Sequence, residues 1–280
     1  HTQRRRQRQM CIRDRLIRGV KNAPSPKWLQ NRLRAIGLRP ISTLVDITNF
    51  FTYDTNRPLH VFDADKLNGT SIRVHDALGG EKFSALDDKE YVLSKGMTVI
   101  SDSEGIESLA GIMGGSASGC TNTTENVFIE AAYFNPIRTA YTGRELKINS
   151  DARYRFERGI DPEWTAFGIE AATKMIIELC GGEPSNVVQA GEIPNHGRAY
   201  KVDTARIESL VGMAIPPHKQ LNILENLGFV IKGDTASVPS WRPDIQGEAD
   251  LVEEIARVVS LTKLQVYRFL ELLMQSQNLY

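Results

Sequence analysis

The sequence contains little cysteine, no long apolar run and no net charge. Its three cysteines, Cys11, Cys120 and Cys180, lie far apart and form no CxxC pair. This spacing argues against a zinc site or a disulfide framework and indicates a reducing compartment. No apolar stretch reaches the length of a membrane-spanning helix, and the N-terminus has no apolar signal-peptide region. We therefore expect a soluble, cytoplasmic protein without a membrane partner.

The formal net charge of zero hides an uneven distribution. Residues 1–21 hold eight of the 34 basic groups and one of the 34 acidic groups, so the remaining sequence carries a formal charge of −7. An acidic body is a poor general binder of nucleic acid, because nonspecific affinity comes mainly from neutralising phosphates. For residues 1–22 we expect a basic leader that is disordered or foreign, with an RNA-binding arm as the alternative.

A length of 280 residues allows two domains. Residues 192–200 (EIPNHGRAY) are polar and rich in turn residues, which is typical of a linker. We predict an α+β fold, with a mixed α/β domain over residues 23–196 followed by a small winged-helix-like α+β domain over residues 197–262. Residues 263–280 form a divergent tail.

Helical spacing predicts two helices in the first domain. One spans residues 24–37, with Ser25 as its N-cap, and the other spans residues 162–181. Their apolar residues recur at intervals of three and four, so these faces are predicted to be core. They are Trp28, Leu29, Leu33 and Ile36 in the first helix and Phe167, Ala171, Met175 and Leu179 in the second.

Residues 45–65, VDITNFFTYDTNRPLHVFDAD, mix apolar and polar side chains in one short segment. Taken alone, the segment predicts a strand, a turn at Pro58 and the start of a second strand. Thr48, Asn49 and His60 can donate and accept hydrogen bonds at the wall of a pocket. A half-buried histidine with satisfied hydrogen bonds is the alternative.

Four glycines lie among small residues in LAGIMGGSASG, residues 109–119. The segment is neither a P-loop nor a GxGxxG sequence followed by a helix. It predicts either tight turns in a β-rich region or a backbone that approaches a ligand closely, because glycine has no side chain to obstruct it.

A single carboxylate, Glu130, interrupts the apolar strand predicted over residues 127–136. A buried charge is costly unless it is paired or hydrogen-bonded. Glu130 therefore either pairs with an arginine, for which Arg144, Arg153 and Arg155 are available, or faces a ligand.

Arginines and glutamate alternate in SDARYRFERGIDP, residues 150–162. This pattern predicts an ion-pair network, with an RNA-facing edge as the alternative.

Acidic residues cluster near the end of the second domain, in SWRPDIQGEADLVEEIARVV. On a helix Asp250, Glu253 and Glu254 share one face, and Asp244 precedes it. Grouped carboxylates of this kind suit Mg²⁺. Acids in a first helical turn are also favoured by the helix dipole without a metal.

Five motifs, in this order, resemble the β subunit of bacterial phenylalanyl-tRNA synthetase. They are PSPKWLQNRLRAIGLRPIS, VDITNF…RPLHVFD, LAGIMGG, SDARYRFERGIDP and PSWRPDI…EADLVEEIARV, and together they span most of the chain. The resemblance implies that residues 23–196 are an editing, tRNA-binding domain. Residues 197–262 correspond to the winged-helix-like module with its acidic Mg²⁺ site.

The resemblance also implies an assembly and a chemistry. The whole enzyme of this family is a class II phenylalanine–tRNA ligase, an α₂β₂ tetramer that joins phenylalanine to tRNA(Phe) with ATP and Mg²⁺. Its α subunit carries the synthetic site, while the editing domain of the β subunit hydrolyses mischarged tyrosyl-tRNA(Phe). The chain is accordingly expected to be a fragment that does not aminoacylate alone.

Carried over by motif, the editing pocket consists of seven residues. The catalytic residues are Thr48, Asn49, His60 and Glu130, and the substrate-binding residues are Pro58, Gly111 and Ala152. The implied Mg²⁺ ligands, in a site shared with the α subunit, are Asp244, Asp250, Glu253 and Glu254. Glu130 is expected to act as a carboxylate acceptor for the tyrosine hydroxyl. Since no Ser-His-Asp arrangement is visible, we expect direct attack by water.

Two other functions fit parts of the sequence. A free-standing trans-editing aminoacyl-tRNA deacylase would use the same pocket without synthetase partners. A non-enzymatic nucleic-acid-binding module would use the winged-helix-like unit and the arginine-rich head, although the acidic helix argues against it.

Overall fold

The structure, a computed structural model, describes residues 10–69 and 71–259. The chain divides into two compact units, residues 1–195 and 196–280. Both units combine helices with antiparallel strands, so the predicted α+β class is confirmed. The divergent tail predicted for residues 263–280 lies outside the described residues. Within the described ranges, no helix has both the length and the apolar character needed to span a bilayer.

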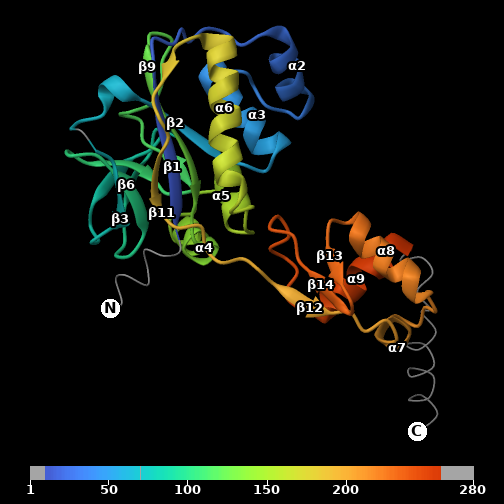
Figure 1. Ribbon diagram of the computed structural model, residues 1–280. Helices are drawn as coiled ribbons and strands as arrows, with labels where there is room; N and C mark the ends of the chain where they lie inside the picture. The colour runs from blue at the N-terminus through green and yellow to red at the C-terminus, as the bar shows by residue number, and fades with distance from the viewer. Residues whose placement is uncertain (1–9, 70, 260–280) are drawn as a thin grey trace, which may run out of the picture. The chain divides into compact units, whose positions relative to one another are not determined.

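A five-stranded antiparallel sheet forms the centre of the first unit (Figure 1). Strand β1 (Cys11–Arg18) lies in its middle and pairs with β9 (Asn126–Tyr133) along eight residues. The other edge of β1 pairs with β10 (Glu183–Pro184) and β11 (Val188–Gly191). The far edge of β9 pairs with β2 (Leu59–Asp63).

The position of β1 shows that the leader predicted for residues 1–22 is wrong for Cys11–Arg18. Both edges of this strand are hydrogen-bonded, and Cys11 and Ile17 are fully buried. Its arginines are accommodated by local pairing, because Arg15 donates two hydrogen bonds to the carboxylate of Glu170. The basic composition of the segment concealed a core strand. Residues 1–9 lie outside the described part of the chain.

Three helices cover one face of this sheet: α2 (Lys27–Ala35), α3 (Thr43–Asp54) and α6 (Trp164–Cys180) (Figure 1). The strand predicted to begin at Val45 is therefore wrong, since this segment is helical. The buried residues of α3 include Leu44, Ile47 and Phe51, which recur at helical spacing. That spacing outweighs the β-branched and aromatic residues that favoured a strand.

Some predicted details of α2 and α6 also differ. Pro26 occupies the N-cap position of α2, and Ser25 instead donates a hydrogen bond to Asp46 of α3. Trp28 and Ile36 are about half exposed, and Phe167 is 67 % exposed, so these three side chains are not core. The core face of α6 is one helical position away, at Ile169, Ala172 and Ile176.

The opposite face of the sheet adjoins a smaller β-rich region, visible in Figure 1 on the side away from α6. One four-stranded sheet has the order β3–β6–β7–β8, and β4 and β5 form a hairpin. The strands are β3 (Arg73–Asp76), β4 (Lys82–Ser84), β5 (Glu90–Val92), β6 (Thr98–Ser101), β7 (Ile106–Leu109) and β8 (Met113–Gly114). The short helices are η1 (Ala64–Lys66), α4 (Pro136–Glu145) and α5 (Asp151–Phe156).

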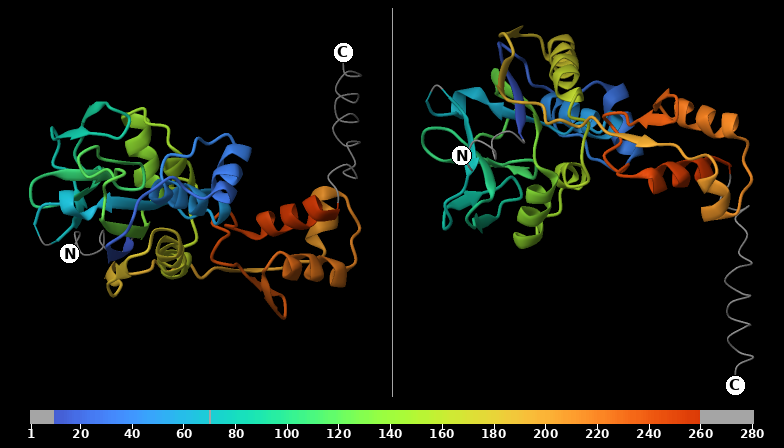
Figure 2. Two further views of the ribbon diagram at one scale, coloured as in Figure 1. Left: turned by 90° about the horizontal axis from the view of Figure 1, so that it is seen from above. Right: turned by 60° about the horizontal axis from the view of Figure 1, so that its bottom comes forward.

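The second unit packs three helices against a three-stranded sheet of order β12–β14–β13, seen from two further sides in Figure 2. Its strands are β12 (Ala199–Lys201), β13 (Val230–Lys232) and β14 (Thr235–Ser237). Its helices are α7 (Arg206–Val211), α8 (Pro217–Asn226) and α9 (Glu248–Val259). Helices and strands are thus combined in this unit, as predicted for its α+β fold, whereas β12 falls at the end of the predicted linker.

Candidate active site

A cavity of about 500 Å³ lies in the first unit. Its wall is formed by α3, β2, the turn between β7 and β8, β9 and the start of α5. Pockets of this size hold one small ligand. All seven residues assigned by motif to the editing pocket line it: Thr48, Asn49, Pro58, His60, Gly111, Glu130 and Ala152.

His60 and Glu130 stand directly opposite each other on the antiparallel strands β2 and β9. Opposite residues of such a pair point to the same face, so the imidazole and the carboxyl share the cavity. Phe62 packs edge-on against the imidazole, with the ring centroids 4.3 Å apart. A Cβ added to Gly114 would lie 2.6 Å from Nε2 of His60. Glycine at this position therefore leaves the space that the ring occupies.

Glu130 is buried and has no basic partner among residues 10–69 and 71–259. Two of the arginines considered as partners are engaged elsewhere, since Arg153 pairs with Glu157 and Arg155 pairs with Asp151. The ion-pair alternative for Glu130 is therefore wrong. The carboxyl faces the cavity instead.

Burial, and secondarily Asp14 opposite it on β1, raise the pKa of the Glu130 carboxyl to about 8. At neutral pH the group is mostly protonated and can both donate and accept a hydrogen bond. In place of the ionised acceptor expected from the sequence, the cavity contains a neutral carboxyl. Burial likewise lowers the pKa of the His60 imidazole to about 4, so the ring is neutral at pH 7.

The cavity offers no activated nucleophile from the described side chains. Burial raises the pKa of the Cys120 thiol, which lines the cavity, to about 12, so it remains an unreactive thiol. The hydroxyls of Thr48, Ser108 and Ser150 each donate to a backbone carbonyl, those of Val45, Met113 and Ile112.

Sequence reasoning missed an aromatic floor beneath Gly111. The rings of Phe134 and Phe156 lie 5.2 Å apart and both line the cavity. A Cβ on Gly111, whose φ is +70°, would lie 2.9 Å from Phe134 and 3.0 Å from Phe156. The signal was present in the spacing, because Phe134 follows Glu130 by four residues in an extended segment and Phe156 follows Ala152 by four on a helix.

Arg57 fixes the turn that presents Pro58 and His60. Its guanidinium is 1 % exposed and donates to the carbonyl of Ala132 on β9, 2.9 Å away, and to the carbonyl of Asp161 before α6. Burial lowers the pKa of Arg57 to about 10, which leaves it charged. The Arg57 side chain thereby connects its own turn to strand β9 and to the segment before α6.

The predicted ion-pair network of α5 is confirmed. Glu157 accepts from Arg153 and Arg158, each at 3.0 Å, and Asp151 lies 3.6 Å from Arg155. Asp151 also lines the cavity, so the network extends to its rim.

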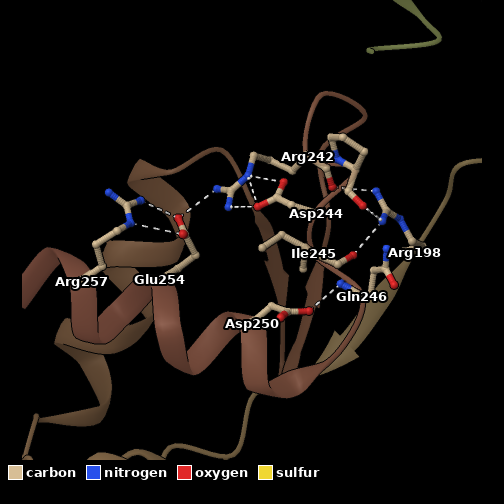
Figure 3. A network of polar contacts seen from close by, with 9 residues as sticks. Arg198, Arg242, Asp244, Ile245, Gln246, Asp250, Glu254 and Arg257 are labelled. Atoms are coloured by element: carbon tan, nitrogen blue, oxygen red, sulfur yellow. Dashed lines mark hydrogen bonds and ion pairs between the residues drawn. The ribbon is translucent and has the colours of Figure 1, made fainter. Parts of the chain in front are cut away.

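The four acids expected to bind Mg²⁺ lie in the second unit, and Figure 3 shows three of them, Asp244, Asp250 and Glu254. Arg242 donates to Asp244 at 2.6 Å and to Glu254 at 2.9 Å, and Arg257 donates to Glu254 at 2.7 Å. The carboxylate of Asp250 accepts from the backbone N–H of Gln246. Hydrogen bonds from Arg242 hold the pKa of Asp244 below its usual range.

These contacts do not fit a cation site. No group of three or more possible metal ligands is gathered within residues 10–69 and 71–259. Asp244 and Glu254 are neutralised by arginine, and the Glu253 side chain is exposed on α9. The expected Mg²⁺ ligands are thus close in sequence, but two of them, Asp244 and Glu254, share the guanidinium of Arg242 as their partner.

Comparison with known proteins identifies two family models along the chain. The B3/4 domain model matches residues 10–181, and the tRNA synthetase B5 domain model matches residues 200–260. Phenylalanine–tRNA ligase β subunits of Ruegeria pomeroyi and Cereibacter sphaeroides are 65 % and 63 % identical over 250 and 251 residues. These alignments cover 89 % and 90 % of this chain, which spans 31 % of each relative.

A solved structure is also similar in part. It is an N-terminal fragment of the phenylalanyl-tRNA synthetase β subunit from Pyrococcus horikoshii, 15 % identical over 87 % of this chain and 69 % of that one. Its TM-score of 0.38 is too low to support any conclusion.

Proposed function

This chain belongs to the B3/4 domain family, in the B3/4–B5 arrangement of the phenylalanine–tRNA ligase β subunits, and we propose that its first unit hydrolyses mischarged tyrosyl-tRNA(Phe). The observation that carries the proposal is the cavity in which His60 and the neutral, unpartnered Glu130 lie side by side. Within the whole enzyme, the proposed partners are the α subunit, in an α₂β₂ tetramer, and tRNA(Phe), with ATP as a substrate.

Selection of tyrosine follows from the state of Glu130. Tyrosine differs from phenylalanine by one hydroxyl, which a purely apolar pocket distinguishes poorly. The protonated carboxyl of Glu130 can exchange hydrogen bonds with that hydroxyl. With phenylalanine bound, the same carboxyl would stay buried without a partner, a cost of about 1–3 kcal/mol, or roughly five- to a hundredfold.

The remaining groups position the ester and the water. Asn49 lines the cavity, and its side-chain amide makes no hydrogen bond in the described part of the chain, so this amide is available to the terminal ribose or the ester. The neutral imidazole of His60 can accept a hydrogen bond from the attacking water. The water oxygen bonds to the ester carbon, the bond to the ribose oxygen breaks, and that oxygen takes the proton. The products are tyrosine and tRNA with a free 3′ end.

The comparisons favour a ligase subunit over a free-standing deacylase. The alignments with ligase β subunits run through both units, including the B5 match, which a deacylase acting alone would not need. Mg²⁺ is left out of the proposed hydrolysis, because two of the four acids expected to hold it, Asp244 and Glu254, are paired with Arg242.

A deacylation assay tests the proposal. The chain is incubated with tyrosyl-tRNA(Phe) and phenylalanyl-tRNA(Phe), with and without the α subunit. We expect faster release of tyrosine than of phenylalanine, and we expect Glu130→Ala to abolish that preference. Equal rates and selectivity for wild type and Glu130→Ala would reject the assignment.

A further inference from the structure

Two arginine–tyrosine pairs lie at the rim of the cavity. The guanidinium of Arg158 lies 3.7 Å from the centroid of the Tyr154 ring, and that of Arg155 lies 4.3 Å from the centroid of the Tyr53 ring. These four residues are named the rim platform here. Tyr154 and the Arg158 side chain are both about half exposed, so the outer pair is open to a ligand.

The rim platform is continuous with the cavity wall. Asp151 and Ala152 of α5 line the cavity, and Tyr154 follows Asp151 by three residues, so these two side chains are neighbours on one face of the helix. On α3, Tyr53 directly follows Thr52, another lining residue. Burial, followed by a hydrogen bond with Asp151, raises the pKa of Tyr53, and Arg155 lies 3.6 Å from the same carboxylate, so the Tyr53–Arg155 pair adjoins a residue of the cavity wall.

The outer pair is held in a stacking geometry before any ligand arrives. Arg158 donates to the backbone carbonyl of Tyr154 at 2.9 Å and to the carboxylate of Glu157 at 3.0 Å. These bonds keep the guanidinium plane over the ring. A surface that is fixed in advance loses little conformational entropy on binding. Exposed aromatic rings next to arginines are the features with which proteins hold single-stranded nucleic acid, by base stacking and cation–π contact.

The proposed substrate is larger than the cavity. A volume of about 500 Å³ suits the aminoacyl group and its nearest surroundings. The preceding nucleotides of the single-stranded 3′ end must therefore lie outside the cavity, and the rim platform adjoins its wall at Asp151 and Thr52. We propose that Tyr154 and Arg158, together with the Tyr53–Arg155 pair, bind these unpaired 3′ nucleotides by stacking. The proposal rests on the proposed hydrolysis of an aminoacyl-tRNA.

Two substrates distinguish the contribution of the rim platform to hydrolysis from that of the cavity. Tyrosyl-tRNA(Phe) has the preceding nucleotides, whereas 2′(3′)-O-tyrosyl-adenosine has the ester without them. For Tyr154→Ala we expect kcat/KM on tyrosyl-tRNA to fall by about five- to a hundredfold, the range of one lost base stack. Hydrolysis of tyrosyl-adenosine should stay within twofold of wild type. An equal loss on both substrates, or on neither, overturns the proposal.

Two matched variants sharpen the test. Tyr154→Phe keeps the ring face and should retain full activity on tyrosyl-tRNA, so a loss in this variant would contradict stacking. Tyr141→Ala removes a tyrosine that is still more exposed, from α4 and outside the cavity wall, and should change neither rate.

Direct binding makes the result independent of hydrolysis. A fluorescent single-stranded RNA ending in CCA is titrated with the 280-residue chain, and anisotropy is recorded at two salt concentrations. We expect weaker binding for Tyr154→Ala and Arg158→Gln, and a shallower salt dependence for Arg158→Gln. If wild type fails to hydrolyse tyrosyl-tRNA(Phe), the proposed function is rejected, and the oligonucleotide titration alone decides on the rim platform. No binding by wild type, or unchanged binding by both variants, overturns it.

Discussion

The Glu130 carboxyl and the His60 imidazole lie side by side on the paired strands β9 and β2, and burial moves their pKa values in opposite directions. Both groups are consequently uncharged near pH 7. A hydroxyl that enters the cavity meets two neutral hydrogen-bonding groups and no fixed ion at this position. The pair can therefore recognise a phenol without first stripping water from a buried charge.

Replacement of Glu130 by glutamine should stabilise the chain at neutral pH. The folded-state pKa of Glu130, about 8, lies above the ordinary value of 4.5, so the folded chain holds this proton more tightly than the unfolded chain does. The free energy of unfolding is therefore highest below pH 4.5 and falls as the pH rises towards 8. Glu130→Gln removes this loss, worth about 3 kcal/mol at pH 7. Urea unfolding of both proteins between pH 5 and 8 checks it. Because both proteins contain His60, its effect cancels when their free energies of unfolding are subtracted. If the two free energies change with pH in parallel, the raised pKa of Glu130 is contradicted.

Replacement of Gly114 by alanine should displace His60. The new Cβ would lie 2.6 Å from Nε2, so the ring must leave its position between Gly114 and Phe62. We expect deacylation of tyrosyl-tRNA to fall at least tenfold, with a stability cost of about 1–3 kcal/mol from overpacking. Gly105→Ala is the control, because a Cβ there meets no atom within 4 Å. Wild-type activity of Gly114→Ala would show that the imidazole is dispensable.

Replacement of Arg57 by lysine should destabilise the first unit although the charge is kept. A lysine ammonium cannot reproduce the fork that reaches Ala132 and Asp161 at once, so one buried carbonyl loses its donor. We expect a loss of about 1–3 kcal/mol in urea unfolding. Arg34→Lys, at an exposed position on α2, is the matched control and should leave the midpoint unchanged.

Removal of divalent cations should leave the second unit intact. Arg242 already neutralises Asp244 and Glu254, so EDTA is expected to shift no calorimetric unfolding transition. Arg242→Gln, by contrast, leaves two carboxylates without their shared donor and should cost about 1–3 kcal/mol. Lys201→Gln breaks an exposed pair and should have no measurable effect. A transition that falls with EDTA in wild type would restore the cation site expected from the sequence.

Cavity residues could be predicted from the sequence where a residue type was unusual for its local pattern. Glu130 stood out as a lone carboxylate in an apolar strand, and the structure places it on the cavity wall. The helical pattern of α3 was misjudged because its β-branched and aromatic residues favour strands, while burial of Leu44, Ile47 and Phe51 on α6 and the sheet decides otherwise.

Other features depended on partners that no local pattern reveals. The spacing of the acids near α9 predicted cation ligands. It could not reveal that the side chain of Arg242 donates hydrogen bonds to both Asp244 and Glu254. Likewise, the charge-rich Cys11–Arg18 segment becomes a central strand only because strands from two distant parts of the chain pair with its edges.

The central place of β1 sets an order of events during synthesis. Its Asp14 pairs with Glu130 on one side and with Val188 on the other, so both neighbours are translated more than a hundred residues later. At ordinary elongation rates the emerging strand waits roughly ten to thirty seconds for its hydrogen-bonding partners. Such non-local pairing slows folding. Until β11 has left the ribosome, a nascent chain therefore lacks the strand that pairs with the second edge of β1 at Cys11–Asp14.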